Sequence, residues 1–194
     1  MPLNHHGLFR TSRGIGTPRT RRYDAYKDAK KLGITVEFVK FSLFDKPGMN
    51  GLYLPHDDVI FINSDLDENG RHDELAHQLA HRCYHKSGRV IDEARIREET
   101  AHRLIPVKPL IAVIEAVLEE EKAGAPTPQT AVEIADRLGS HVSTVRDRLR
   151  FCSLRELAGE LGALYSRIPW PKIPERQCIH DSSLHELLQM GGHS

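Results

Sequence analysis

The sequence has few cysteines, no net charge and no long apolar run. Its three cysteines are odd in number and form no C-x-x-C pair, which fits a reduced, cytoplasmic protein best. No segment approaches the roughly 18 apolar residues of a membrane span, and no signal peptide is visible. Because 27 basic side chains balance 27 acidic ones, the charge of the whole protein does not favour binding to nucleic acid or anionic lipid.

The charge is nevertheless uneven near the start of the chain. Residues 10–22 contain five arginines and no acidic residue, together with Ser, Thr, Gly and Pro. That composition cannot build a core, so we expect residues 1–21 to be a disordered basic arm. The arm could contact nucleic acid, but a solvated tail is the simpler interpretation.

Apolar patterns in the first half predict an α+β fold. Residues 23–32 have the pattern of a helix that ends at Gly33, and the β-branched and aromatic run that follows predicts a strand ending near Phe41. Two further apolar runs, 51–54 and 59–62, flank a short polar turn, which predicts a β-hairpin. We therefore expect a small antiparallel sheet packed against helices.

Helical periodicity dominates the rest of the chain, with helices expected at about 69–84, 91–104 and 110–121. A Pro-rich break between Pro106 and Pro128 predicts a domain boundary. The expected parts are an N-terminal domain at residues 22–106 and a helical appendage at 107–164. Residues 165–194 should form a Pro-rich, mostly irregular tail with a short helix at 180–190.

The most informative stretch is Asp73-Glu74-Leu75-Ala76-His77. In the usual H-E-x-x-H motif, two histidines lie about 40° apart on one helical face and bind one zinc ion, and the Glu between them is the general base. Here Asp73 replaces the first His. Because a carboxylate oxygen binds zinc at roughly the same bond length, Asp73 and His77 are candidate ligands and Glu74 is the candidate base.

A second pair of histidines lies on the same helical stripe. His77 and His81 are also four residues apart and could bind zinc together, with Glu93 or Asp73 as the third ligand. Alternatively, His81 and His85 are partly exposed residues near the helix end, or donate hydrogen bonds to the ligands. The residues alone leave both interpretations open.

The order of these motifs resembles the ImmA/IrrE family of metallo-endopeptidases. In that family the second helix reads approximately E-x-x-A-N-x-F-A-A-x-L-L-M-P, and counting back from Pro106 places Glu93 at its glutamate. The resemblance covers residues 22–106 well and the helical region to about residue 164 more loosely, as in phage-encoded members. It rests on G-I-T-V at 33–36, G-L-Y-L-P at 51–55, the D-E-x-x-H helix and the segment 93–106.

The resemblance implies a zinc-dependent endopeptidase in which Asp73, His77 and Glu93 bind the metal and Glu74 polarises the attacking water. Asp73 stands where the family has His, and a site richer in oxygen ligands tolerates Mn²⁺ or Fe²⁺ better. The implied substrate is a helix-turn-helix repressor, in a phage or mobile-element switch in a bacterial cytoplasm. The alternative is a weak or inactive member that acts by binding a repressor or DNA.

Two short helices in the appendage resemble a helix-turn-helix. Residues 130–138 and 142–149 are apolar on one face each and are joined by a turn at Gly139. The second helix carries Arg146, Arg148 and Arg150, which are the candidate DNA contacts because a recognition helix needs basic side chains for phosphates. Packing against the rest of the protein is the alternative role.

Overall fold

The structure is a computed structural model that describes residues 23–40, 48–120, 126–151 and 168–172. Within these ranges the fold is α+β, with one mixed three-stranded sheet and six helices. The expected basic arm and the expected helix at 180–190 lie outside the described residues. None of the described helices combines the length and apolar character needed to cross a bilayer.

The sheet consists of β1 (Thr35–Val39), β2 (Gly51–Leu54) and β3 (Val59–Asn63), in the order β1-β3-β2. β2 and β3 pair antiparallel, as the hairpin prediction requires. β1 pairs with the other side of β3, and this pair is parallel. The expectation of an all-antiparallel sheet is therefore wrong for β1. Side-chain alternation identifies a strand but does not specify the direction of its neighbour.

The first three helices begin and end at residues that satisfy their free backbone groups. α1 (Ala25–Leu32) ends at Gly33, whose φ of 69° is left-handed. α2 (Glu68–Ser87) begins after Asp67, which accepts a hydrogen bond from the Gly70 N–H. α3 (Glu93–Leu104) begins after Asp92, whose carboxylate accepts from the backbone N–H groups of Ala94 and Arg95.

The remaining helices are α4 (Val107–Glu120), α5 (Pro128–Leu138) and α6 (Val142–Arg150). α4 starts three residues earlier than expected and includes Pro109 in its first turn. The first turn tolerates proline because its N–H groups have no partner within the helix. Gly139, with a φ of 63°, makes the tight connection between α5 and α6.

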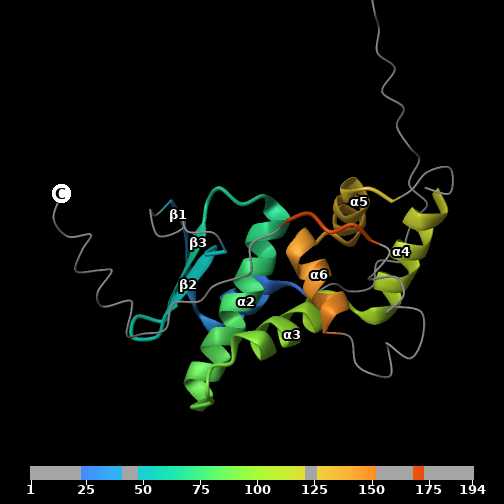
Figure 1. The fold of residues 1–194 in the computed structure, drawn as a ribbon. Coiled ribbons are helices and arrows are strands. Elements are labelled where there is room, and N and C mark those ends of the chain that lie inside the picture. Colours follow the sequence, from blue (N-terminus) through green and yellow to red (C-terminus); the bar gives the residue numbers. More distant parts are fainter. Residues whose placement is uncertain (1–22, 41–47, 121–125, 152–167, 173–194) are drawn as a thin grey trace, which may run out of the picture.

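Figure 1 shows α2 in the middle of the molecule, with the sheet on one side and α6 on the other. One buried apolar cluster extends through the sheet, α1, α2, α4, α5 and α6. Residues from both sides of the expected domain boundary belong to it, such as Ile60, Leu75, Ile114, Ile134 and Val145. The N-terminal domain and the appended helices therefore share one core among the described residues.

Helix α6 is attached to α3 through buried charged groups. Arg97 of α3 donates to both carboxylate oxygens of Asp147, at 3.0 and 2.7 Å. Arg148 is 2% exposed and donates to the carbonyl oxygen of Ile105 at 2.9 Å. Arg148 therefore points into the protein and is not placed to contact DNA, which corrects its selection from the sequence. Arg146 is partly buried and Arg150 is exposed, and DNA contact through these two stays a prediction.

Asp147→Ala should lower the free energy of unfolding by about 3–5 kcal/mol, because it leaves the Arg97 guanidinium buried without its carboxylate. Urea unfolding followed by circular dichroism measures the change. The matched control is Glu120→Ala, which breaks the exposed ion pair with Arg137 and should cost far less, because solvent screens an exposed pair. Equal losses in the two variants would contradict a special role for the buried pair.

Candidate metal centre

The face of α2 that is turned into the protein carries polar side chains. Spacings of three and four residues place them on one stripe of the helix. All are buried, with at most 6% of the residue exposed: Asp73, Glu74, His77, Gln78 and His81. Burying such groups costs free energy unless each forms a hydrogen bond or an ion pair. The groups that bind these side chains therefore indicate the role of the stripe.

Two histidines of the stripe converge on the first residue of α3. The Nε2 atom of His77 lies 3.1 Å from one carboxylate oxygen of Glu93, and the Nε2 atom of His81 lies 3.2 Å from the other. The two Nε2 atoms are 3.2 Å apart. One ligand atom from each of the three residues lies within 4.8 Å of the others, so two imidazoles and one carboxylate meet at one point.

The donor set fits a zinc ion. Two atoms that are each about 2.0–2.1 Å from a tetrahedral zinc lie roughly 3.3–3.4 Å from each other, which is close to the separations of 3.1 and 3.2 Å between the side chains of His77, His81 and Glu93. Two imidazoles with one carboxylate are a common ligand set of catalytic zinc sites, in which a fourth position stays open.

Burial also favours the protonation state that binds metal. It lowers the pKa of His81, against the opposing effect of the Glu93 carboxylate, which accepts its hydrogen bond. A lowered pKa keeps the imidazole neutral near neutral pH, and only the neutral ring offers a lone pair to a metal.

Asp73 lies outside this group and has other partners. One of its carboxylate oxygens accepts the backbone N–H of His141, at the start of α6, at 2.8 Å. The other is 3.3 Å from Nδ1 of His72, whose Nε2 accepts the N–H of Ala25. The structure thus brings His77 and Glu93 together with the alternative ligand His81. It does not support Asp73 as a ligand, and metal binding by Asp73 stays a prediction.

With His77 and His81 as the pair of ligands, the position after the first histidine is occupied by Gln78. In H-E-x-x-H sites this position holds the general base, so the chain reads H-Q-x-x-H at its metal-binding turn. The Nε2 of Gln78 donates to a carboxylate oxygen of Glu74 at 2.8 Å. Both side chains lie against Gly51 of β2, where an added Cβ would come within 2.7 Å of Glu74. Gln78 is not among the residues selected from the sequence, although the His77–His81 spacing points to it.

His85 is the next histidine of the stripe, and it packs against the sheet. Its ring centroid lies 5.7 Å from that of Tyr53 in β2. Among the described residues it is not part of the group formed by His77, His81 and Glu93. His85 is partly exposed in the last turn of α2, which is one of the two interpretations that the sequence left open, and a hydrogen bond from it to a ligand stays a prediction.

The hairpin turn is fixed to α2 next to the metal-binding turn. Arg82 donates to both oxygens of Asp58 at 2.6 and 2.7 Å, and the hydroxyl of Tyr53 donates to Asp58 at 2.9 Å. The hydrogen bonds from Arg82 hold the pKa of Asp58 down to about 2. This ion pair positions β2 beside the helix that carries the histidines.

A family model described as the IrrE N-terminal-like domain of peptidase family M78 matches residues 29–150. This range contains the three converging side chains and helices α4, α5 and α6. No curated protein matches the chain.

His81→Ala should remove most of the bound zinc, because two protein ligands hold the ion poorly. Asp73→Ala is the matched comparison from the same helix face. It should keep zinc at the parent level while lowering the melting temperature, since it removes the acceptor for the His141 N–H. Zinc content of the purified variants, measured by mass spectrometry, tests both. Loss of zinc in Asp73→Ala with retention in His81→Ala would restore Asp73 as the ligand.

Asp58→Asn should destabilise the protein at neutral pH by about 1 kcal/mol, since the ion pair is partly exposed. The pKa of Asp58 is lower in the folded state than its ordinary 3.8. Its contribution is therefore present above about pH 4 and is lost as the pH falls towards about 2. The gap between the urea midpoints of parent and variant should narrow over that range, and a constant gap would contradict the assignment.

Proposed function

The chain belongs to the M78 family of peptidases, and we propose that it is a zinc-dependent endopeptidase whose metal is held by His77, His81 and Glu93. The observation that supports this proposal is the convergence of three ligand atoms from two helices on one point, two of them on buried histidines and one on the partly buried Glu93. Structural zinc sites use four protein ligands, whereas catalytic sites use three and keep one position open. Mn²⁺ or Fe²⁺ would compete less well here than in the carboxylate-rich site expected from the sequence, because two of the three ligands are imidazoles.

When bound, zinc supplies a Lewis acid that polarises a peptide carbonyl and activates water. The chain must supply a proton acceptor, and the neutral carboxamide of Gln78 cannot be one. The carboxylate nearest to that position is Glu74, which accepts the hydrogen bond from Gln78. We assign Glu74 as the general base, with Gln78 as the positioning residue that orients its carboxylate.

The substrate class rests on the resemblance alone. A helix-turn-helix repressor is the protein substrate that the ImmA/IrrE likeness implies, and a phage or mobile-element switch is the setting.

A second candidate function is binding without efficient hydrolysis, in which the site holds a repressor or DNA. Gln78 at the usual position of the base favours it. Burial of Glu74 adds to this, since only 2% of the residue is exposed and a general base must come within hydrogen-bond distance of the proton that it accepts. The two functions differ in whether zinc-loaded protein turns over substrate.

Glu74→Gln should slow peptide cleavage by about 10² to 10⁴, the usual effect of losing a proton acceptor, with zinc content unchanged. Cleavage of a complex peptide mixture, followed by mass spectrometry at saturating zinc, measures it. Glu68→Gln is the matched control, because Glu68 is an exposed glutamate at the start of the same helix, and should cleave at the parent rate.

Gln78→Glu separates the two functions. If the parent is active and Glu74→Gln is not, the peptidase proposal and its base both hold. If the parent loaded with zinc cleaves nothing while Gln78→Glu gains activity, the binding function is correct. Parent activity that survives in Glu74→Gln would remove Glu74 from the mechanism and leave the peptidase assignment intact.

A further inference from the structure

Gly51, the first residue of β2, lies against two polar side chains of α2. A Cβ added at this glycine would lie 2.7 Å from Oε1 and 2.8 Å from Cγ of Glu74, and 3.1 Å from Cγ of Gln78. Figure 1 shows β2 beside α2. Non-bonded heavy atoms are best separated by about 3.5–4.0 Å, so Glu74 occupies the space that a side chain at position 51 would need.

The strand is held on both sides of this contact. Just before Gly51, the carbonyl oxygen of Asn50 accepts the N–H of Asn63 at 2.9 Å. Beyond the other end of β2, Arg82 of α2 donates to both carboxylate oxygens of Asp58 in the hairpin turn. The backbone at Gly51 is therefore fixed relative to α2, and an added methyl group has to displace Glu74.

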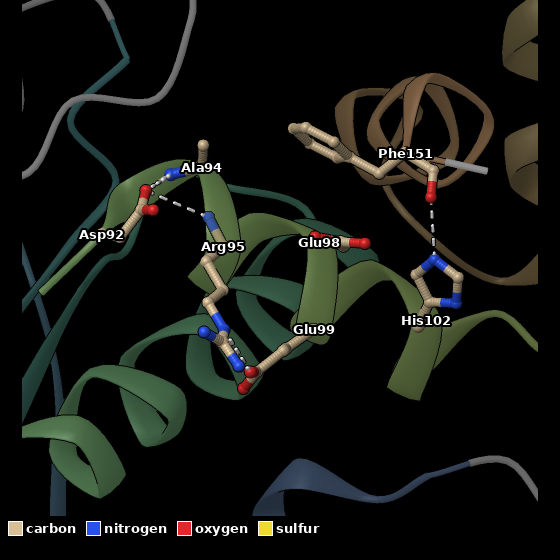
Figure 2. Close-up of a pocket in the computed structure, with 7 residues that line it drawn as sticks. All are labelled: Asp92, Ala94, Arg95, Glu98, Glu99, His102 and Phe151. Carbon is tan, nitrogen blue, oxygen red and sulfur yellow. Dashed lines mark hydrogen bonds and ion pairs between the residues drawn. The ribbon is translucent and has the colours of Figure 1, made fainter. Parts of the chain in front are cut away.

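The Glu74 side chain is enclosed by its neighbours. Only 2% of Glu74 and 3% of Gln78 are exposed. The oxygen of Glu74 that approaches Gly51, Oε1, also accepts the hydrogen bond from Nε2 of Gln78 at 2.8 Å. Figure 2 shows a groove of about 530 Å³ beside α3, but its lining contains none of these three residues. The carboxylate is therefore held between the amide of Gln78 and the bare backbone of Gly51.

We propose that Gly51 is a positioning residue, because the absence of a side chain at position 51 gives the Glu74 carboxylate its place. Its effect on catalysis rests on the proposed function, in which Glu74 is the general base. A methyl group at position 51 would displace Oε1 by roughly 0.8 Å, the difference between 2.7 Å and an ordinary contact of about 3.5 Å. Misplacing a reacting group by about 1 Å can slow a reaction about 10²-fold.

A double-mutant cycle of unfolding tests the contact without reference to catalysis. Gly51→Ala should lower the melting temperature of the parent by roughly 2–10 °C, as expected for overpacking in a protein of this size. In the Glu74→Ala background the same change should be neutral or stabilising. The atoms that the methyl group meets are then gone, the φ of Gly51 is not positive, and alanine lowers the entropy of the unfolded chain. Thermal unfolding followed by circular dichroism measures all four proteins.

Peptide cleavage at saturating zinc tests the effect on the reaction. Gly51→Ala should lower kcat about 10²-fold while zinc content and KM stay at the parent level. The three atoms nearest to the added Cβ belong to Glu74 and Gln78, not to the candidate zinc ligands. In the Glu74→Gln background, Gly51→Ala should cause no further loss of activity, because the base through which it acts is already absent.

Gly70→Ala is the matched control for crowding of a carboxylate. A Cβ added at Gly70 would lie 2.9 Å from a carboxylate oxygen of Asp67, the cap of α2. This variant carries the same replacement on the other side of a similar contact, away from Glu74. It should lose stability and cleave peptides at the parent rate.

Three results would overturn the proposal. The first is an equal fall in melting temperature with and without the Glu74 side chain, since the methyl group would then meet other atoms. The others are loss of zinc in Gly51→Ala and equal slowing of cleavage by Gly70→Ala. If the parent cleaves nothing, the proposed peptidase function fails, and a non-additive unfolding cycle would still support Gly51 as the residue that places Glu74.

Discussion

Burial of a polar helix face is the constraint on which the rest of the structure depends. Five polar residues of α2 are removed from water, and each must recover the hydrogen bonds that it loses. The partners come from different parts of the chain. Glu93 at the start of α3 meets the two histidines, the backbone of His141 meets Asp73, and β2 leaves room for Glu74 and Gln78 through Gly51. The polar stripe thus determines where α3, α6 and the sheet are placed around α2.

The same constraint explains why the appended helices belong to the core. Asp73 of α2 and Arg97 of α3 both bind groups of α6, so α6 is fixed by the two helices that also carry the candidate metal ligands. A helix that exposes basic residues to DNA needs them on its free surface. Here Arg148 is directed inward to the Ile105 carbonyl. Helices α5 and α6 therefore resemble a helix-turn-helix in their local geometry, and the contacts described here pack them against the rest of the protein.

The candidate metal centre combines a common zinc ligand set, His77, His81 and Glu93, with an amide at the position where H-E-x-x-H sites hold the base. Membership of the M78 family and the grouping of His77, His81 and Glu93 both point to metal-dependent peptidase chemistry. The residue after the first histidine, Gln78, carries an amide. The carboxylate that bonds to it belongs to Glu74, one turn earlier on the same face of α2. The Glu74 carboxylate brings a negative charge near the candidate site. To accept a proton from a bound substrate or water, however, its side chain must move away from Gln78 and Gly51.

The sequence by itself determined the elements and the general location of the site. Periodicity and caps located the helices and the hairpin to within a few residues, and Glu93 and His77 were selected correctly as neighbours, because these features depend on local spacing. The choice between Asp73 with His77 and His77 with His81 could not be made in this way, since both pairs have the same four-residue spacing and the same angle on the helix. The tertiary structure favours the second pair, because it places Glu93 against the two histidines and the N–H of His141 against Asp73. The parallel pairing of β1 and the inward direction of Arg148 were also determined only by the tertiary structure, because both depend on residues distant in the sequence.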